Sequence, residues 1–375
     1  MAKTVRIRHA EVFALTVGQG MSFLARLVIY AWRTICLAYT RLRWPALSQR
    51  PALLLHYETP AQRQAYSGAS GFSLVGAVPA QANAGTKILV IIPFRDKWEL
   101  TDACVSTLKK QDFAGAEVLA LLVDNGSTEP ATLAGLERLL AEAPTGKLRF
   151  ALHKFDIPFN YSRLNNLAVQ AGANFGADHY LLLNNDVYFT ESGTVAAMAK
   201  FLSGTPKAAS VGCSLLYPDR TIQHLFIYVG CKIVGAHPYK GRLLDLTDPW
   251  CGQPRPVGAA TAALLMVRAK DYQAVDGFDE SLPSCYQDVD LALKFLDLGQ
   301  TNWVIPRLTA IHAETQTRRP DHHWSEVEYM QDKWGKKLTE NAYISTKFCR
   351  WSEQIALALG EGAYPWHWLA KQDSK

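Results

Sequence analysis

Strand-like and helix-like patterns alternate along residues 87–204 of the chain. Short apolar runs typical of buried strands are followed by longer stretches in which apolar residues recur every three or four positions, as they do on one face of a helix. The predicted strands cover residues 88–92, 117–123, 148–152 and 180–183, and the predicted helices cover residues 99–110, 131–141, 162–173 and 192–202. Such alternation with short connections predicts an α/β fold, in which helices flank a Rossmann-like, mostly parallel central sheet.

The pattern changes after residue 205. Further strands are expected at residues 208–216, 221–229 and 256–267, and an acidic loop and a helix follow them. Residues 60–86 are rich in Ala, Gly, Ser and Gln, which favours a linker or an irregular wrap. We therefore divide the chain into an N-terminal basic amphipathic helix and linker, an α/β domain, and a helical, Trp-rich C-terminal extension, which cover residues 1–86, 87–318 and 319–375.

Residues 12–40 are mostly apolar, but arginines interrupt them. Gln19, Arg26 and Arg33 recur every seven residues, so a helix would carry them on one face. This pattern predicts an amphipathic helix that lies in the membrane interface, with Arg41 and its neighbours near anionic headgroups. Two alternatives stay open: the helix packs on the protein or a partner, or it spans the membrane and buries an arginine.

The net charge of +5 is unevenly distributed. Residues 1–50 carry eight basic residues against one acidic residue, so the rest of the chain has a net charge of about −2. The basic character belongs to the N-terminal arm, and no zinc-finger, helix-turn-helix or basic-zipper pattern indicates nucleic-acid binding. The seven cysteines are scattered without a C-x-x-C pair, which is typical of reduced thiols in the cytoplasm. No convincing cleavable signal peptide precedes the arm.

Polar segments follow three of the predicted strands, at residues 93–96, 124–127 and 184–186. Because ligands of such sheets bind at the carboxyl ends of the strands, we expect these segments to face one crevice. Asp186, at a strand end, could hold Mg²⁺ or Mn²⁺. Asp288 begins an apolar-periodic helix, whose N-terminus would keep it ionised, and it could accept a proton from an attacking hydroxyl.

Each of these carboxylates also has a plain structural interpretation. Asp124 would cap the turn at Asn125-Gly126. Asp186 would be an ordinary turn residue, and Asp288 would be an ordinary helix N-cap. Asp290 lies four residues before Lys294, and this spacing favours a supporting ion pair on one helix.

Eight short motifs in order make residues 87–318 resemble the inverting family 2 glycosyltransferases with the GT-A fold. The resemblance is strongest to the bacterial cell-surface polysaccharide branch, which includes rhamnosyl- and galactofuranosyl-type transferases. The motifs occupy residues 91–96, 123–127, 160–166, 183–187, 216–224, 277–280, 287–290 and 311–312. Two positions depart from the family pattern: Asn184 stands where the metal motif often has Asp, and Gln287 stands where the acidic pair often has Glu. Since an amide is a weaker metal ligand, the resemblance implies a lower metal affinity.

The resemblance implies a role for each matching residue. Asp288 would be the base for direct displacement with inversion, and Asp186 and His312 would bind the metal. The residues implied to bind the donor are Pro93, Arg95, Asp124, Arg163, Asn165, Asn184 and Asn185. The residues implied to border the sugar or acceptor are His224, Gly258, Ala259 and Asp290.

The function that the resemblance implies is a glycosyltransferase dependent on Mg²⁺ or Mn²⁺. It would move a sugar from a UDP- or dTDP-sugar to a lipid-linked or growing cell-surface polysaccharide, as a peripheral protein on the cytoplasmic face of the cell membrane. The non-enzymatic alternative is a degenerate, glycosyltransferase-like scaffold that binds nucleotide-sugars at the membrane. A nucleotidyltransferase is disfavoured, because residues 93–98 contain no glycine-rich loop to hold a triphosphate.

Overall fold

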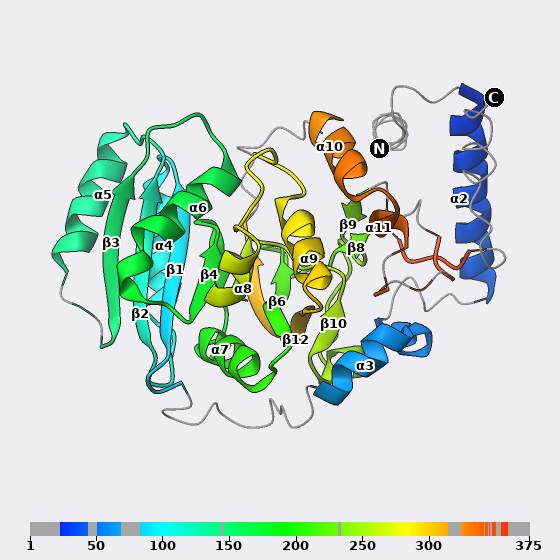
Figure 1. The fold of residues 1–375 in the computed structure, drawn as a ribbon, viewed down its shortest axis with the longest axis horizontal. Coiled ribbons are helices and arrows are strands. Elements are labelled where there is room, and N and C mark those ends of the chain that lie inside the picture. The colour runs from blue at the N-terminus through cyan, green and yellow to red at the C-terminus, as the bar shows by residue number, and fades with distance from the viewer. Residues whose placement is uncertain are drawn as a thin grey trace.

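The computed structural model describes most of the chain. It covers residues 23–43, 51–68, 83–142, 144, 146–231, 234–313, 324–340, 342–343, 345, 347–349 and 354–358. A mixed sheet with helices on both of its faces forms the centre of the molecule (Figure 1).

The main path of the sheet has the strand order β10-β12-β6-β11-β4-β1-β2-β3. Its strands are β1 (Lys87–Phe94), β2 (Glu117–Asp124), β3 (Leu148–Lys154), β4 (His179–Leu183), β6 (Ala208–Leu216), β10 (Arg255–Val257), β11 (Leu264–Arg268) and β12 (Thr301–His312). Strands β3, β2, β1 and β4 are parallel, whereas β11 runs antiparallel to both β4 and β6. The predicted α/β fold with a mostly parallel central sheet is therefore confirmed.

Alternate residues of β1 point to two different cores. Leu89 and Ile91 pack in one core with Leu164 of α6 (Tyr161–Ala171), and Ile88 packs in the other with Leu108 of α4 (Trp98–Leu108). Because both faces of such strands are covered, their sequences are nearly continuous apolar runs. The helices that flank the sheet are α4 (Trp98–Leu108), α5 (Pro130–Ala141), α6 (Tyr161–Ala171), α7 (Thr194–Gly204), α8 (Ala269–Ala274) and α9 (Gln287–Asp297).

Two of the expected strands are each divided in the structure. Residues 221–229 form β7 (Ile222–His224), which extends the main sheet, and β8 (Tyr228–Val229), which pairs with β9 (Gly235–Ala236). Residues 256–267 contribute to β10 and β11, which occupy separate positions in the sheet. Asn302 joins the segment between β10 and β11 to α9, because its side-chain nitrogen donates to the backbone oxygens of Gly258 and Ala292, at 3.3 and 3.0 Å.

Part of the expected linker is a helix, α3 (Pro60–Gly68). The prediction missed a capping box. Gln62 N donates to Thr59 Oγ1 at 3.2 Å, and Thr59 N donates to Gln62 Oε1 at 2.9 Å. The helix packs against β10, the edge strand of the sheet (Figure 1), and thereby covers the edge of the sheet. Residues 69–82 of the expected linker lie outside the described residues.

The N-terminal helix α2 (Phe23–Arg43) packs on the C-terminal segment of the chain. Cys36 is buried beside Cys349, and Thr40 Oγ1 accepts a hydrogen bond from Leu357 N at 2.8 Å. The other side of α2 exposes apolar residues, namely Leu27, Val28, Tyr30, Ile35, Tyr39 and Leu42. Within the described part of the chain, no helix is long and apolar enough to cross a membrane. Gln19 lies outside that part. Membrane binding by α2 stays a prediction.

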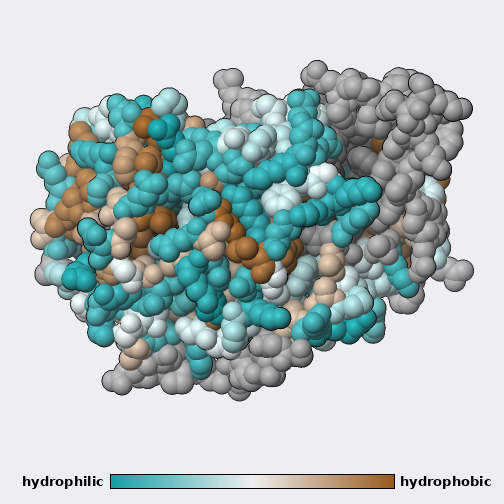
Figure 2. All heavy atoms as spheres, viewed as in Figure 1, coloured by the Kyte–Doolittle hydropathy of each residue, from teal (hydrophilic) through white to brown (hydrophobic). Residues whose placement is uncertain are grey.

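The C-terminal extension contains α10 (Trp324–Trp334) and α11 (Lys336–Thr339). Figure 2 shows a mostly hydrophilic face, with hydrophobic side chains gathered mainly at the end of the sheet that α5 covers and a smaller hydrophobic group near the centre of the view. Leu133 and Leu140 of α5 are exposed. Trp351 and the tryptophans after residue 359 lie outside the described residues.

Candidate active site

The loops after β1 and β2 form one polar edge of the sheet. Asn125 N donates to Phe94 O at 2.9 Å, and Asp96 N donates to Ser127 Oγ at 2.8 Å. The buried Asp124 accepts from Ser127 N at 2.8 Å, so its carboxylate caps the turn as the structural interpretation expects. These contacts place the first two polar segments side by side. A contact between Asp124 and a donor stays a prediction.

The turn after β4 brings the third polar segment to the same edge. Asn184 N donates to Ala263 O at 2.9 Å, and the side-chain nitrogen of Asn185 donates to Thr101 Oγ1 at 3.0 Å. Both asparagines are partly exposed, whereas Asp186 is buried. The short strand β5 (Val187–Phe189) then pairs with the end of β12 and sets His312 opposite Val187. This pairing positions His312 next to Asp186.

Asp186 and His312 form a pair that fits a divalent metal ion. His312 Nε2 lies 3.2 Å from Asp186 Oδ1, and His312 Nδ1 lies 2.6 Å from Gln223 Oε1. Since an amide oxygen only accepts hydrogen bonds, Nδ1 carries the proton, and in neutral His312 the lone pair of Nε2 faces the carboxylate. Two adjacent ligands of an octahedral Mg²⁺ would lie about 3.0 Å apart, because each bond is about 2.1 Å long. The described residues contain no cluster of three His, Cys, Asp or Glu side chains that could hold a metal.

Asp288 lies in the first turn of α9, after Tyr286, which adopts the left-handed conformation with φ at 63°. Its Oδ1 accepts from Val289 N at 2.9 Å, and its carboxylate also bonds with the Ala262 backbone and the Thr261 side chain. Burial raises the pKa of Asp288, and these hydrogen bonds oppose the rise. A fixed carboxylate with a raised pKa is suited to general-base chemistry.

Residues 261–263 connect the two carboxylate sites. Thr261 and Ala262 bond with Asp288, whereas Ala263 O accepts from Asn184 N in the turn that precedes Asp186. The same segment reaches His224, since Thr261 N donates to His224 Nε2 at 3.3 Å. The sequence pattern predicted this segment as part of a strand, and the resemblance placed Thr261 near the sugar or acceptor, but the role of the segment as a bridge between the two sites was missed.

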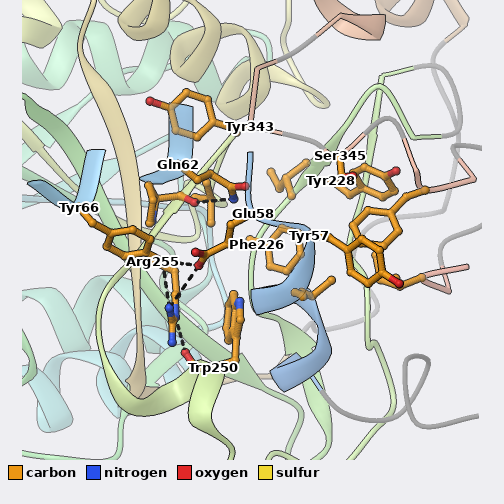
Figure 3. A pocket seen from close by; sticks show the side chains of 17 residues that line it. Tyr57, Glu58, Gln62, Tyr66, Phe226, Tyr228, Trp250, Arg255, Tyr343 and Ser345 are labelled. Carbon is orange, nitrogen blue, oxygen red and sulfur yellow. Dashed lines mark hydrogen bonds and ion pairs between the residues drawn. The ribbon is translucent and has the colours of Figure 1, made fainter. Parts of the chain in front are cut away.

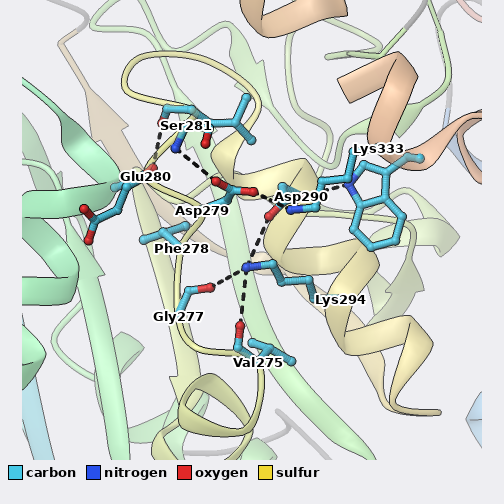
Figure 4. A network of polar contacts seen from close by, with 12 residues as sticks. Val275, Gly277, Phe278, Asp279, Glu280, Ser281, Asp290, Lys294 and Lys333 are labelled. Carbon is cyan, nitrogen blue, oxygen red and sulfur yellow. Dashed lines mark hydrogen bonds and ion pairs between the residues drawn. The ribbon is translucent and has the colours of Figure 1, made fainter. Parts of the chain in front are cut away.

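Asp290 has a different place from the one that the resemblance implied. Its carboxylate is fully buried, with Lys333 Nζ at 2.7 Å, Trp334 Nε1 at 2.8 Å and Lys294 Nζ at 3.4 Å (Figure 4). A fully buried carboxylate that is neutralised in this way does not line an acceptor pocket. The ion pair with Lys294 that the spacing predicted is confirmed. Lys333 and Trp334 were missed, because they belong to the extension that contains no recognisable motif.

Two further expectations need correction. Asn165 is fully buried on the sheet side of α6, where its side-chain nitrogen donates to Tyr161 O at 2.8 Å, so it is not exposed to a donor. Ala259 is also fully buried, and its oxygen accepts from Ile227 N at 2.8 Å. Of the other expected donor residues, Arg95 and Arg163 are exposed and Pro93 is partly exposed, and these three assignments stay predictions.

Gly258 lines a separate cavity between the N-terminal segment and the edge of the sheet (Figure 3). Arg255 is buried in the wall of this cavity, 3.0 Å from Tyr66 Oη and 3.5 Å from Glu58 Oε1. Its Nε and Nη2 donate to the backbone oxygens of Trp250 and Pro249, both at 2.7 Å. Because protein groups accept hydrogen bonds from Arg255 on all three of its nitrogens, we interpret the cavity as part of the contact between α3 and the sheet.

The chain is similar to known proteins of bacterial polysaccharide biosynthesis. No protein-family model matches the chain. The chain is 30% identical over 240 residues to the O-antigen biosynthesis protein RfbC of Myxococcus xanthus, a match that covers 63% of this chain and 18% of that protein. It is 26% identical over 239 residues to an N-acetylglucosaminyl-diphospho-decaprenol L-rhamnosyltransferase of Mycobacterium tuberculosis, which covers 58% of this chain and 75% of that protein. The chain is similar to bacterial polysaccharide glycosyltransferases.

The chain also matches a second bacterial protein and a solved mannosyltransferase. An uncharacterized protein of Sinorhizobium fredii is 30% identical over 280 residues, or 70% of this chain and 30% of that protein. The chain thus spans only 18% and 30% of the first two relatives. The solved mannosyltransferase PcManGT from Pyrobaculum calidifontis, in complex with GDP-Man and Mn²⁺, matches with a TM-score of 0.49 and 15% identity, over 82% of this chain and 76% of that one. The sequence relatives confirm the resemblance to bacterial polysaccharide glycosyltransferases, and the mostly parallel central sheet confirms the predicted α/β fold class.

Proposed function

We propose that the chain is an inverting, metal-dependent glycosyltransferase that uses a UDP- or dTDP-sugar. Its acceptor would be lipid-linked or a growing cell-surface polysaccharide. The observation that carries this proposal is the segment of residues 261–263, which binds Asp288 on one side and the turn before Asp186 on the other. One short segment thus joins a carboxylate suited to proton transfer to a carboxylate suited to metal binding.

Asp186 and His312 would hold Mg²⁺ or Mn²⁺ in this enzyme. Oxygen atoms of the donor diphosphate and of water would complete the coordination. When bound, the ion supplies Lewis-acid neutralisation of the departing diphosphate. Since the protein offers few ligands and Asn184 is a neutral amide, we expect the nucleotide to strengthen metal binding.

Asp288 would act as the base. It accepts the proton of the acceptor hydroxyl while the hydroxyl oxygen attacks the anomeric carbon. The bond from that carbon to the nucleotide diphosphate breaks on the opposite face, so the configuration inverts and the proton remains on Asp288. The hydrogen bonds from Val289, Ala262 and Thr261 favour the ionised form of the carboxylate against the effect of burial and fix its direction.

The donor would lie along the polar edge formed by the loops after β1, β2 and β4. Asp124 would contact the nucleoside, with Pro93 and Arg95 beside it. Arg163, whose Nε lies 3.8 Å from Glu280 Oε2, is exposed at the start of α6 and would approach the ribose or the diphosphate. Asn184 and Asn185 would border the sugar diphosphate.

The exposed apolar side of α2 supports a peripheral position on the inner face of the cell membrane. Leu27, Ile35 and Leu42 lie on this side and are exposed, while Cys36 faces the protein. A helix with one apolar side and nearby arginines can lie in the interface of an anionic bilayer. This position would bring the enzyme to an acceptor carried by a lipid.

The first experiment measures the thermal stability of the chain with UDP, dTDP and GDP, each with and without MnCl₂. A ligand that binds the native state raises the apparent melting temperature. We expect a Mn²⁺-dependent rise with UDP or dTDP, and release of that nucleotide from a matching nucleotide-sugar. Asp288→Asn should keep the nucleotide-induced shift but lower turnover by about 10²- to 10⁴-fold, the usual contribution of a general base.

The outcomes separate the proposal from its rival. A folded protein that binds a nucleotide-sugar without turnover would be the degenerate scaffold. Absence of any nucleotide-induced shift would reject both the donor site and the transferase. A turnover that Asp288→Asn leaves unchanged would reject Asp288 as the base.

A further inference from the structure

Strand β7 departs from regular pairing at the position of Gln223. Leu215 of β6 pairs with His224, and Leu216 pairs with Ile222, so the register shifts between them and Gln223 is the extra residue. Neighbouring side chains of a regular strand point to opposite faces. A bulge changes these directions and often re-aims a side chain at an active site. Here the side chains of Gln223 and His224 both contact the site region.

Gln223 contacts the metal side of the site. Its Oε1 accepts from His312 Nδ1 at 2.6 Å, and its side chain is buried. This hydrogen bond fixes both the ring orientation and the tautomer of His312, so that Nε2 points at Asp186. Partners of this kind set the basicity and geometry of a metal-binding histidine.

His224 contacts the base side of the site. Its Nε2 accepts from Thr261 N at 3.3 Å, and its Nδ1 lies 2.9 Å from His237 Nδ1. Burial, the largest cause, and the neighbouring His237 and His312 lower the pKa of His224, so the ring is neutral. Neutral His224 therefore carries its proton on Nδ1 and donates it to His237, which leaves Nε2 free to accept from Thr261.

Thr261 connects His224 to the Asp288 carboxylate. The Thr261 side chain bonds with the Asp288 carboxylate, while the Thr261 backbone nitrogen bonds with His224. Two adjacent residues of β7 thus support different halves of the site. Gln223 acts through His312, and His224 acts through Thr261.

We propose that Gln223 and His224 are positioning residues that the β7 bulge aims at the metal site and at the base, respectively. The inference rests on the proposed function, and neither residue touches the reacting atoms. Gln223 would set metal affinity without setting the intrinsic rate. His224 would set the rate through Asp288 without setting metal affinity.

The test of Gln223 uses Gln223→Leu, which has a similar size but no hydrogen-bond acceptor. The first readout needs no activity: ¹⁵N NMR of the histidine rings in the metal-free protein should show His312 protonated at Nδ1 in the wild type and no longer in the variant. In the presence of UDP or dTDP, Mn²⁺ affinity measured by EPR titration should fall about 10- to 100-fold. The matched control is Gln111→Leu, at a buried glutamine that contacts Glu191 O and Val195 N instead.

The test of His224 compares two amides that differ only in reach. The amide of Gln can place an oxygen near the position of His Nε2, whereas that of Asn reaches only the position of Nδ1. His224→Gln should therefore keep turnover within a few-fold, and His224→Asn should lower kcat about 10-fold or more. Mn²⁺ affinity should change little in either variant.

Three results would overturn the inference in a wild type that binds and turns over a nucleotide-sugar. The first is a Gln223→Leu protein in which both the His312 tautomer and the Mn²⁺ affinity are unchanged. The second is an equal kcat for the two His224 variants. The third is a loss of Mn²⁺ affinity in His224→Asn as large as that in Gln223→Leu. A wild type that neither binds Mn²⁺ with a nucleotide nor turns over would reject the proposed function itself. In that case the NMR readout still decides whether Gln223 fixes His312.

Discussion

Lys333 of α10 lies 2.7 Å from the Asp290 carboxylate, two residues along α9 from Asp288. The same ammonium lies 2.5 Å from Asp279 in the loop that precedes α9, and Tyr329 Oη donates to that carboxylate at 2.6 Å (Figure 4). One side chain of the C-terminal extension therefore joins the helix that carries Asp288 to the loop before it. This contact makes the extension part of the support of the site.

Lys333→Met tests this support. The substitution keeps most of the apolar stem but leaves the fully buried Asp290 with Lys294 as its one ion-pair partner among the described residues. Breaking a buried ion pair typically costs 3–5 kcal/mol. Because Lys333 is partly exposed and Lys294 remains, we expect a loss of about 2–3 kcal/mol in the free energy of unfolding. Urea denaturation measures this loss.

Lys337→Met is the matched control, since Lys337 pairs with Asp297 on the surface, where both side chains are about half exposed. Exposed pairs are worth about 0–1 kcal/mol.

The loss of unfolding free energy in Lys333→Met should also become smaller in acid. Burial opposes ionisation of Asp279, but the hydrogen bonds from Lys333 and Tyr329 prevail and lower its pKa. That stabilisation is present above the unfolded pKa of about 3.9 and is lost as pH falls towards the folded pKa. Equal losses in the two variants would contradict the buried network.

The parts of the fold and site that depend on local pattern were predictable from the sequence. Asp288 was placed correctly at a helix start, because the apolar periodicity of residues 287–297 is local. The capping box at Thr59 and Gln62 is equally local and could have revealed α3. The bridge from Lys333 to Asp290 could not be foreseen, because it joins two helices that carry no complementary pattern.

The pairing of Asp186 with His312 came from the family resemblance and not from the pattern. It depends on the antiparallel register of β5 and β12, which join residues far apart in the chain. The burial of Asn165 shows that a motif match can also predict a site residue wrongly. Its motif matches, but the α6 face that carries it is turned to the core. The motifs therefore predicted which segments lie at the edge of the sheet better than they predicted which side chains point outward.

Thr261→Val should change the pH dependence of turnover. Burial raises the pKa of Asp288, and the Thr261 hydroxyl is one of the groups that lower it. Without this hydroxyl the carboxylate binds its proton more tightly, so the acid limb of kcat/KM should move to higher pH by about one to two units, since a hydrogen bond to a charged group contributes about 1.5–3 kcal/mol. Thr261→Ser keeps a hydroxyl and should keep the wild-type limb. A limb that does not move in Thr261→Val would show that the hydroxyl does not influence the base.

Metal removal should abolish turnover reversibly. EDTA is expected to stop release of the nucleotide, and excess Mn²⁺ or Mg²⁺ should restore it. His312→Ala removes one of the two protein ligands, so it should need at least about tenfold more Mn²⁺ for half-maximal turnover. His153→Ala is the control, because His153 is exposed at the end of β3. Full turnover in EDTA, after exhaustive dialysis, would rule out a metal-dependent transferase.

The apolar side of α2 predicts binding to anionic vesicles. Wild-type protein should sediment with vesicles of phosphatidylglycerol, and high salt should weaken only the electrostatic part of the binding. Ile35→Glu combined with Leu42→Glu places two charges on this exposed side. Burying one such side chain is worth about 1.5–3 kcal/mol, so the doubly substituted protein should bind at least about tenfold more weakly. Leu298→Glu is the control at a leucine that lies at the end of α9 and is about as exposed as Ile35. If the wild type ignores these vesicles, or if the double variant binds as well as the Leu298 control, the apolar side of α2 is not the membrane contact.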